Sequence, residues 1–358
     1  MKTTEEPRRI LAIKLGAMGD LVIASSFFDA LRRQFTTPGA EIVLLTGKTY
    51  ARVLEHHPCF DRLILADDFI LYCGGMLARL GELFRLVGLL REEKFDLVFV
   101  LHRAWQFNLL AFLSGIPRRV GFSRGKEGVF LTDRVSPVPS RNEREAYLDL
   151  LRIINIPAVY EKSFYYLSPE EDCFLADFLK RHNICGEDRL IGIGPGGGRN
   201  VKSYMPTRRW PIENYTHLAK KIVKENGCRV VLFGGRDEKD LAIRVLSESP
   251  ECLDAMDLSY GEMASVFRRC LLYIGNDSGP LHIADAMGIP TLSFYGPTNP
   301  QTQAPLGERS HVLFKHVECS PCYKDGYFPQ CGHITCLNSI TVDEVWEKVK
   351  VFLGRKQS

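Results

Sequence analysis

The sequence lacks the long apolar runs and the charge excess that mark several common classes of protein. In 358 residues, no stretch approaches the roughly 18 to 20 uninterrupted apolar residues that are needed to span a bilayer. The 46 Lys and Arg residues nearly balance the 43 Asp and Glu residues, which leaves a formal charge of +3. A general nucleic-acid-binding protein needs a stronger basic excess, so we expect no nucleic-acid partner. No export signal fits the first residues, and we expect a soluble, cytoplasmic protein.

The composition and the alternation of patterns predict two α/β domains. Apolar residues make up 45% of the chain, which is enough for packed cores, and the length suits two domains of roughly 150 to 180 residues. Short apolar runs alternate with helical spacing, which favours parallel sheets covered on both faces. We therefore expect two Rossmann-like, doubly wound domains, over residues 1–166 and 167–340. A last helix, over residues 341–358, is expected to pack back on the first domain.

Glycine-rich and polar clusters follow the predicted strands in both halves. In open parallel sheets, ligands bind beyond the carboxyl ends of the strands, so these clusters point to the site. The predicted strands are 9–14, 41–46, 61–65 and 96–101, then 189–193, 228–233, 270–274 and 291–295. The predicted helices include 21–35, 49–56, 169–182 and 212–225.

The turn after the first strand, Leu15 to Asp20, places a carboxylate at the start of a helix. This turn lacks Gly-x-Gly-x-x-Gly and also Gly-Lys-Ser/Thr, so it supports neither a dinucleotide fingerprint nor a P-loop. Two roles for Asp20 stay open from the residues alone. It could cap the helix, which is the common role of such an Asp, or it could act as a general base.

Three later clusters in the second half are suited to holding an anion. Glycines after a strand let backbone N–H groups approach a phosphate, helix starts add a favourable dipole, and basic side chains neutralise charge. Each cluster also has a plain structural interpretation, as a surface loop, a helix cap or a packed histidine. The candidate donor-binding residues are Gly196, Lys202, Arg208, Glu238, Asp277, Ser278, Gly279 and His282.

Four of the eleven cysteines lie close together in the sequence, at Cys319, Cys322, Cys331 and Cys336, with His333 among them. The first pair has the spacing of a metal knuckle, so the four are candidate ligands for a structural zinc or iron ion. A reduced structural loop is the alternative that we favour, and a disulfide is the least expected in a reducing compartment.

Five segments together resemble one known family. They are Ile13-Lys14-Leu15-Gly16-Ala17-Met18-Gly19-Asp20, Gly115-Ile116-Pro117-Arg118-Arg119-Val120-Gly121-Phe122, Arg208-Arg209-Trp210-Pro211, Gly275-Asn276-Asp277-Ser278-Gly279-Pro280-Leu281-His282-Ile283-Ala284 and Phe294-Tyr295-Gly296-Pro297-Thr298-Asn299-Pro300. With these segments the chain resembles the heptosyltransferases of glycosyltransferase family 9, which move a heptose from ADP-heptose onto the lipopolysaccharide core. The resemblance covers nearly the whole chain and implies the GT-B fold.

The resemblance implies an inverting transfer in which Asp20 is the general base. It implies nucleotide contacts at Glu238, Asp277, Gly279 and His282, with Arg208 standing where many members have Lys. Lys202 is the other candidate for the cation on the diphosphate, because Arg and Lys are not interchangeable at a tight phosphate site. The candidate acceptor-binding residues are Gly19, Arg118 and Arg119.

The chain contains no Asp-x-Asp, the motif with which metal-dependent glycosyltransferases hold a divalent ion, so we expect catalysis that requires no metal or other cofactor. The expected partners are a nucleotide sugar and a lipopolysaccharide core or other glycan acceptor. The segment 76–93 is predicted to pack on the sheet, with an interfacial helix on the inner membrane as the alternative. Two other functions stay open, a GT-B transferase for another nucleotide sugar and a non-catalytic sugar-nucleotide-binding subunit.

Overall fold

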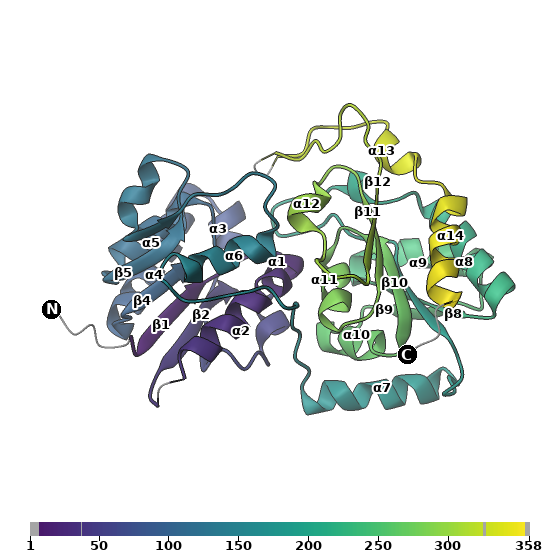
Figure 1. The fold of residues 1–358 in the computed structure, drawn as a ribbon, viewed down its shortest axis with the longest axis horizontal. Coiled ribbons are helices and arrows are strands. Elements are labelled where there is room, and N and C mark those ends of the chain that lie inside the picture. Colours follow the sequence, from purple (N-terminus) through teal and green to yellow (C-terminus); the bar gives the residue numbers. More distant parts are fainter. Residues whose placement is uncertain (1–6, 37, 325–326, 355–358) are drawn as a thin grey trace. The chain divides into compact units, whose positions relative to one another are not determined.

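The computed structural model describes residues 7–36, 38–324 and 327–354, and the chain divides into two compact units, Met1–Phe164 and Tyr165–Ser358. The division expected from the sequence lies close by, after residue 166. Each unit contains one six-stranded parallel sheet with helices packed around it (Figure 1). The α/β class predicted from the alternating pattern is confirmed.

In the first unit the strand order is β3-β2-β1-β4-β5-β6, and every neighbouring pair is parallel. The order reverses between β1 and β4, so the loops after these two strands flank the switch point where such sheets bind ligands. The strands are β1 Arg9–Ile13, β2 Glu41–Gly47, β3 Arg62–Ala66, β4 Leu97–Val100, β5 Arg118–Phe122 and β6 Asp133–Val135.

Two predicted helices of the first unit differ from the observed ones. The segment 21–35 is two helices that meet at Ala24, and the segment 49–56 holds only the 3₁₀ turn η1, Ala51–Leu54. The helices are α1 Met18–Ile23, α2 Ser25–Gln34, α3 Asp68–Cys73, α4 Met76–Glu93, α5 Trp105–Leu113 and α6 Glu143–Arg152, with a second 3₁₀ turn, η2 Lys126–Phe130.

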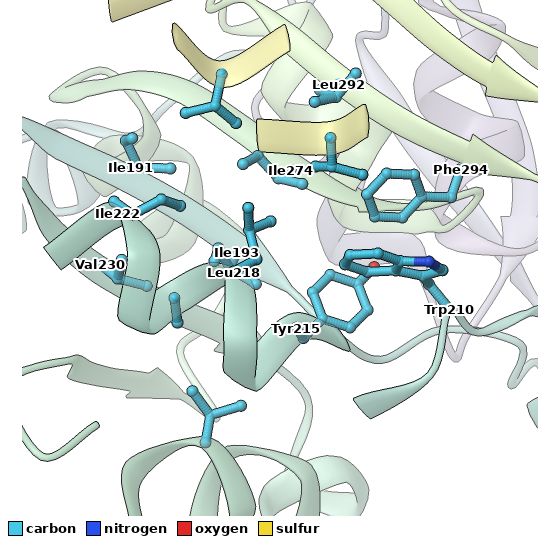
Figure 2. Packing of buried hydrophobic residues seen from close by; sticks show 14 of the residues in the cluster. Ile191, Ile193, Trp210, Tyr215, Leu218, Ile222, Val230, Ile274, Leu292 and Phe294 are labelled. Atoms are coloured by element: carbon cyan, nitrogen blue, oxygen red, sulfur yellow. The ribbon is translucent and has the colours of Figure 1, made fainter. Parts of the chain in front are cut away.

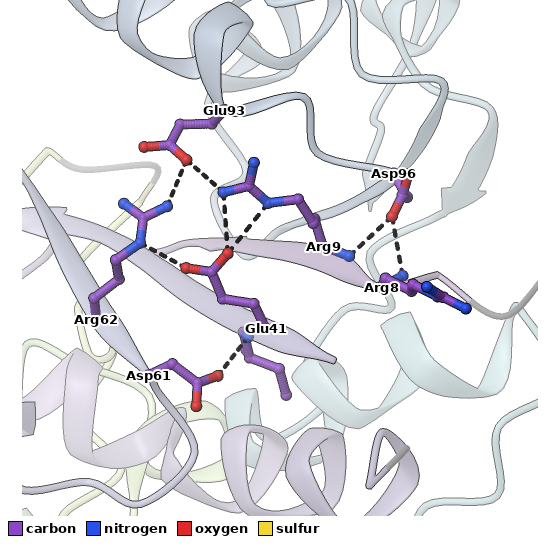
Figure 3. Close-up of polar contacts among 8 residues, drawn as sticks. Arg8, Arg9, Glu41, Asp61, Arg62, Glu93 and Asp96 are labelled. Atoms are coloured by element: carbon purple, nitrogen blue, oxygen red, sulfur yellow. Dashed lines mark hydrogen bonds and ion pairs between the residues drawn. The ribbon is translucent and has the colours of Figure 1, made fainter. Parts of the chain in front are cut away.

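An ionic cluster ties the amino ends of β1, β2 and β3 together (Figure 3). Arg9 and Arg62 each pair with both Glu41 and Glu93, at N–O distances of 2.5 to 3.0 Å. The hydrogen bonds from Arg62 and Arg9 hold the pKa of the Glu41 carboxyl below its usual value, although partial burial acts in the other direction. This network lies at the edge of the sheet opposite to the loops that follow β1 and β4, so we assign it to stability.

The second unit repeats the topology of the first, with the order β12-β11-β10-β7-β8-β9 and parallel pairing throughout. The switch point of this sheet lies between β7 and β10. Its strands are β7 Leu190–Gly194, β8 Arg229–Gly234, β9 Leu253–Met256, β10 Cys270–Asn276, β11 Thr291–Tyr295 and β12 Ser310–Phe314. Its helices are α7 Pro169–Arg181, α8 Ile212–Asn226, α9 Lys239–Glu248, α10 Tyr260–Phe267, α11 Gly279–Ala286, α12 Pro300–Gln303, α13 Thr335–Asn338 and α14 Val342–Gly354, with 3₁₀ turns η3 Pro206–Arg208 and η4 Arg236–Glu238.

Trp210 is the largest fully buried side chain of the second unit and fixes the start of α8 to the sheet. Its ring packs against Tyr215 and Phe294, as Figure 2 shows, with ring centroids 4.9 and 4.6 Å away. The indole N–H donates to the carbonyl of Ile340 at 2.9 Å. Because Trp210 follows Arg208 by two residues, this packing also sets the position of that arginine.

The last helix corrects one expectation from the sequence. α14 packs on α8 and β10 of the second unit, and Val345, Trp346 and Val349 belong to that unit's core, not to the first domain. Lys221 of α8 pairs with Asp343 at 2.6 Å. Residues 355–358 of the predicted helix lie outside the described residues.

Candidate functional site

Asn276, the last residue of β10, joins three segments at the carboxyl ends of the strands in the second unit. Its Nδ2 donates to the carbonyls of Gly196 and Pro195 at 2.7 and 3.1 Å, and its Oδ1 accepts from the backbone N–H of Trp210 at 2.8 Å. The side chain is fully buried, so these three bonds satisfy it without water. Sequence reasoning missed this residue, although a buried amide at the end of a central strand was a usable signal.

Asp277 and Arg208 form an ion pair beside Asn276, in which Asp277 is buried and Arg208 is partly buried. Arg208 Nη2 lies 2.5 Å from Asp277 Oδ2 and also donates to the Asp277 carbonyl at 2.9 Å. Thr298 Oγ1 donates to the same carboxylate at 2.7 Å, and His282 Nε2 lies 3.7 Å from Oδ1. The other face of the guanidinium is over the ring of Phe328, 5.5 Å from its centroid.

The charge of Asp277 is therefore fully used inside the protein. Burial alone would raise the pKa of this carboxyl, but the Arg208 guanidinium and the hydrogen bonds from His282 and Thr298 hold the pKa well below its usual value. The sequence suggested that Asp277 contacts the nucleotide. In the structure the Asp277 carboxylate is bound to the Arg208 guanidinium and holds it in place.

Glu238 is engaged in a similar way at the end of β8. Its Oε1 accepts from the Gly197 backbone at 2.6 Å and from Arg209 Nη2 at 2.9 Å. A Cβ at position 196 would lie 2.2 Å from this carboxylate, so a side chain there would displace Glu238 from its present position. Gly197 has φ +115°, which an L side chain rarely adopts. The carboxylate thus braces the glycine loop.

The start of α11 leaves its first N–H groups without a side-chain cap. Ser278 precedes the helix in an extended conformation and makes no side-chain cap hydrogen bond, and Gly279 and Pro280 are the first two helical residues. The plain capping role that the sequence left open for Ser278 is therefore not observed. Lys202 is exposed, and its backbone N–H donates to Asn200 Oδ1 at 2.8 Å, whereas Arg208 lies at the strand ends.

In the first unit Asp20 lies in the first turn of α1, after β1. The residue that caps this helix is Ala17, and Asp20 itself makes no cap hydrogen bond. Its side chain is 42% exposed, and its Oδ2 lies 3.8 Å from the ammonium of Lys14. The capping role for Asp20 is thus not observed either, and its carboxylate is accessible at the carboxyl end of the sheet.

Two residues from the loop after β4 lie near the same edge. His102 Nε2 accepts from the backbone N–H of Leu15 at 2.7 Å, and the His102 ring stacks on Phe107 with centroids 4.0 Å apart. Arg103 lies 3.7 Å from the carboxylate of Glu143. The loop after β1 is therefore held by the loop after β4.

Arg118 and Arg119, two of the candidate acceptor residues, lie elsewhere. They are the first residues of β5, at the amino end of the sheet, whereas Asp20 follows the carboxyl end of β1. Arg119 donates to the carbonyls of Phe130 and Pro117, and Arg118 pairs with Asp133 at 3.4 Å. Gly19, the third candidate, is buried within α1. The structure thus places the two arginines at the end of the sheet opposite to Asp20, which the motif could not show because it places residues only along the chain.

The four clustered cysteines line one small cavity in the second unit. All eleven cysteines are described and are free thiols. Burial raises the pKa of the Cys322 thiol, and the neighbouring Cys319 and Cys331 raise it further. Within the described ranges, however, no three His, Cys, Asp or Glu side chains are arranged to hold a metal ion. The lining residues are Thr207, Pro297, Cys319, Cys322, Phe328, Pro329, Cys331, His333, Ile334 and Cys336.

The loop that carries the cysteines also supports the Arg208 site. The backbone N–H groups of Cys322 and Tyr323 donate to the carbonyl of Pro297, at 3.0 and 2.9 Å. Pro297 precedes Thr298, which bonds Asp277, and Phe328 stacks on Arg208. The loop therefore contacts Arg208 directly, through Phe328, and is linked to Asp277 through Pro297 and Thr298.

Helix α4 is buried over its second half and exposed over its first half. Its second half packs on the sheet, since Leu86, Val87 and Leu90 are buried in the core of the first unit, which confirms the predicted packing role. Its first half is exposed, and Leu77 and Phe84 are 80% and 67% accessible. Along the described part of the chain, no helix has the length and apolarity to cross a membrane.

Two Rossmann-like units in one chain, one with an accessible carboxylate and the other with a basic, glycine-rich cluster at its strand ends, match the architecture of glycosyltransferases of the GT-B class. Comparison with known proteins agrees: the model of glycosyltransferase family 9 (heptosyltransferase) matches residues 83–330. The chain belongs to this family and is a glycosyltransferase.

Individual relatives support the same assignment. The chain is 25% identical over 326 residues to lipopolysaccharide heptosyltransferase 2 of Escherichia coli, covering 85% of this chain and 87% of that protein. A family 9 glycosyltransferase from Veillonella parvula superposes with a TM-score of 0.80 at 24% identity, covering 97% of each chain. ADP-heptose lipopolysaccharide heptosyltransferase II of E. coli superposes with a TM-score of 0.73 at 23% identity, covering 96% of this chain and 98% of that one. These two structural likenesses establish the GT-B fold.

Proposed function

We propose that the protein transfers a heptose from ADP-heptose to an acceptor on the lipopolysaccharide core. The observation that carries this proposal is the cluster of Arg208, Asp277 and the glycine loop at the strand ends of a family 9 chain. The heptosyltransferases of E. coli and Haemophilus influenzae, each 25% identical over 85% of this chain, support the choice of donor and acceptor.

The second unit binds the nucleotide sugar in this proposal. The Arg208 guanidinium neutralises the diphosphate, and the N–H groups of the loop at Gly196 and of the α11 start at Ser278 and Gly279 donate to its oxygens. Glu238, Asp277 and His282 hold these donors in place, as their hydrogen bonds and ion pairs indicate. Donors that are fixed before the reaction stabilise the negative charge that develops on the departing ADP. Lys202, on the same loop, is the second cation available to the diphosphate.

The first unit supplies the base. The acceptor hydroxyl oxygen attacks the anomeric carbon of the heptose and its proton passes to the Asp20 carboxylate. At the same time the bond between that carbon and the ADP oxygen breaks with its electron pair on ADP. Attack opposite to the leaving group inverts the anomeric centre. Arg103 lies in the loop after β4, at the same end of the sheet as Asp20, and we propose it in place of Arg118 and Arg119 as the cation for an anionic acceptor. Gly19 stays among the proposed acceptor residues because it precedes Asp20 in α1.

We propose that this reaction requires no metal, because the chain has no Asp-x-Asp with which to hold an ion on the diphosphate. Any metal that the protein binds would lie at the cysteine cluster, where thiolates suit zinc or iron and where it would stiffen the loop under Arg208. Such a metal would be structural. Elemental analysis of anaerobically purified protein measures its presence.

We further propose that the enzyme works in the cytoplasm at the inner face of the inner membrane, where a glycolipid acceptor would be presented. The exposed apolar residues of the first half of α4, which include Met76, Leu77, Leu80 and Phe84, are the surface proposed to contact the lipid.

The Asp20→Asn variant tests the proposed function. Asparagine keeps the size of the side chain but cannot accept the proton, so turnover with ADP-heptose and a lipopolysaccharide core acceptor should fall by about 10²- to 10⁴-fold. Binding of ADP, measured by calorimetry, should stay at the wild-type value because the proposed donor site is built from the second unit.

Asp29→Asn is the matched control, since Asp29 lies on α2 and pairs with Arg33 on the surface of the same unit. It should keep wild-type turnover. Wild-type turnover by Asp20→Asn would remove Asp20 from the mechanism. Failure of the wild-type protein to turn over ADP-heptose, with ADP bound, would favour the non-catalytic sugar-nucleotide-binding alternative.

A further inference from the structure

Lys14 is a buried lysine that directly follows β1. The residue is 4% exposed, and its backbone N–H donates to the carbonyl of Leu45 at 3.0 Å, which continues the pairing between β1 and β2. Burying an ammonium ion is costly unless hydrogen bonds and an opposite charge compensate it. The partners of the Lys14 ammonium therefore indicate what it is for.

The ammonium lies between a tyrosine and the proposed base. Lys14 Nζ donates to Tyr147 OH at 2.7 Å, lies 4.9 Å from the centroid of the Tyr147 ring, and is 3.8 Å from Asp20 Oδ2. Tyr147 OH in turn donates to Glu143 Oε2 at 3.2 Å, and Glu143 faces Arg103. A series of hydrogen bonds and ion pairs thus runs from Asp20 through Lys14 and Tyr147 to Glu143 of α6.

Two tyrosines, Tyr147 of α6 and Tyr72 of α3, are affected by the negative charge of Asp20. Burial raises the pKa of Tyr147, and the negative charges of Glu143 and Asp20 raise it further. Burial likewise raises the pKa of Tyr72, with Asp20 and Asp68 as further causes. The negative charge of Asp20 thus raises the pKa of one tyrosine on α3 and of another on α6. Among the ion pairs of the described residues, Lys14 is the cation that lies within 4 Å of Asp20.

Gly16 limits the carboxylate from another side. A Cβ built at this position would lie 3.0 Å from Asp20 Oδ2 and 3.1 Å from Asp20 Cβ, which is tighter than ordinary contacts. Any side chain at position 16 would displace the Asp20 side chain by a few tenths of an ångström. A misplacement of about 1 Å can lower the rate of an enzyme by about 10²-fold, so smaller displacements of a catalytic group are also expected to lower it.

We infer that Lys14 and Gly16 are positioning residues that hold the carboxylate of Asp20 for proton transfer, with Tyr147 holding the Lys14 ammonium in turn. This inference rests on the proposed role of Asp20. Lys14 draws Oδ2 toward the sheet, and no described residue forms a hydrogen bond or ion pair with Oδ1. The proton of the acceptor hydroxyl therefore passes to Oδ1.

The Lys14→Met variant tests the inference through kcat. Methionine keeps most of the side-chain volume but removes the charge, so kcat should fall by about 10- to 100-fold. KM for ADP-heptose and the affinity for ADP should change little. Gly16→Ala should lower kcat by about tenfold in the same manner. The matched controls are Lys48→Met, at a lysine that is 56% exposed, and Gly88→Ala, at a glycine with open space around it.

A double-mutant cycle separates positioning from a general structural role. If Lys14 acts through Asp20, then adding Lys14→Met to Asp20→Asn should cost no further activity, whereas independent effects would multiply. A multiplied loss would overturn the inference, and so would wild-type kcat in Lys14→Met. If Lys14→Met fails to fold, Tyr147→Phe serves instead, because it removes one hydroxyl and should lower kcat with KM unchanged. Unchanged kcat in that variant would count against the inference.

The outcome for Asp20→Asn is read separately. Wild-type turnover by Asp20→Asn alone would refute the proposed base, whatever Lys14→Met does. A dead Asp20→Asn with a fully active Lys14→Met would keep the proposed function and refute only the positioning role.

Discussion

Arg208 and Asp277 show how a single residue's role depends on its partners. Both are motif residues that resemblance links to the nucleotide, yet only the arginine keeps N–H groups that could donate to a ligand. The Asp277 carboxylate is buried and already accepts from Arg208 and Thr298. Without this carboxylate the partly buried Arg208 guanidinium would lose the charge that compensates it, so we expect its side chain to move.

The Asp277→Asn variant should therefore weaken the binding of ADP by tenfold or more, although position 277 is not proposed to touch the ligand. The amide keeps the shape of the side chain and removes the charge that orients Arg208. Calorimetric titration with ADP measures the effect. Asp237→Asn is the control, because Asp237 pairs with Arg199 on the surface of the same unit. Wild-type affinity for ADP in Asp277→Asn would show that Arg208 does not depend on this carboxylate.

Residue-level reasoning from sequence had a clear limit here. It could propose Asp20, Arg208, Glu238 and Asp277 as site residues, because charged residues next to glycines after predicted strands point to a ligand. It could not find the contact between Lys14 and Tyr147, which are 133 positions apart and meet only when α6 packs on the sheet. Nor could it show that Asp277 serves Arg208, since pairing between loops depends on tertiary structure.

At the scale of elements, the apolar residues of α4 are arranged differently in its two halves. Its second half has the spacing of a helix that packs on a sheet, and that half is buried. Its first half has apolar residues around the helix, and these stay exposed. Arg79 is exposed and Arg85 pairs with Glu82, so the surface carries little net charge and apolar contact should dominate.

We expect the protein to sediment with vesicles that contain anionic lipid, and the Leu77→Glu, Phe84→Glu double variant to lose most of this binding. Two carboxylates would face the lipid in place of two large apolar side chains. Turnover with a soluble acceptor should stay unchanged in this variant. Ile243→Glu, on the exposed face of α9, is the control. Equal sedimentation of the double variant and the wild type would exclude the first half of α4 as the lipid-binding surface.

The elements themselves were predictable where the apolar pattern was strong. The central strands β1, β2, β7, β8 and β10 are runs of buried apolar residues, and all were predicted. The short edge strands β6, β9 and β12 were not, because three to five residues with polar members, as in Asp133–Val135, give no distinct period. The break at Ala24 was also missed, since the apolar spacing continues across it.

At the scale of the whole molecule, the chain repeats one topology twice and places different chemistry at the same edge of each sheet. The loops after β1 and β4 of the first unit hold a carboxylate with its supporting lysine. The loops after β7, β8 and β10 of the second unit hold a basic, glycine-rich cluster. This division follows the general rule for ligand sites in open parallel sheets.

The sequence predicted this doubling but misplaced the last helix. The apolar face of the segment 341–358 predicts that this helix packs on a sheet, but the sequence pattern does not indicate on which of the two sheets. The structure places Trp346 in the second unit's core, where Lys221 of α8 lies 6.0 Å from its ring. Such choices depend on the shape of a surface that forms only when the unit folds.

Stability of the folded protein gives the most direct test of donor identity. A ligand that binds only the folded state raises the free energy of unfolding, by about 2.7 kcal/mol at a hundredfold excess over Kd. For a domain of the size of the second unit, Tyr165–Ser358, that corresponds to a rise in Tm of about 5–10 °C. We expect ADP and ADP-heptose to produce this shift in a thermal melt, and UDP- and GDP-sugars to produce none.

The variants make this measurement specific. Asp20→Asn should keep the full shift with ADP, because its carboxylate belongs to the first unit. Asp277→Asn should show a smaller one, because Arg208 is released. An equal shift with UDP- or GDP-sugars would instead support a transferase for another nucleotide sugar. The phosphate contacts proposed here are common to all nucleoside diphosphates. Only the loops that face the base and the sugar can therefore distinguish one donor from another.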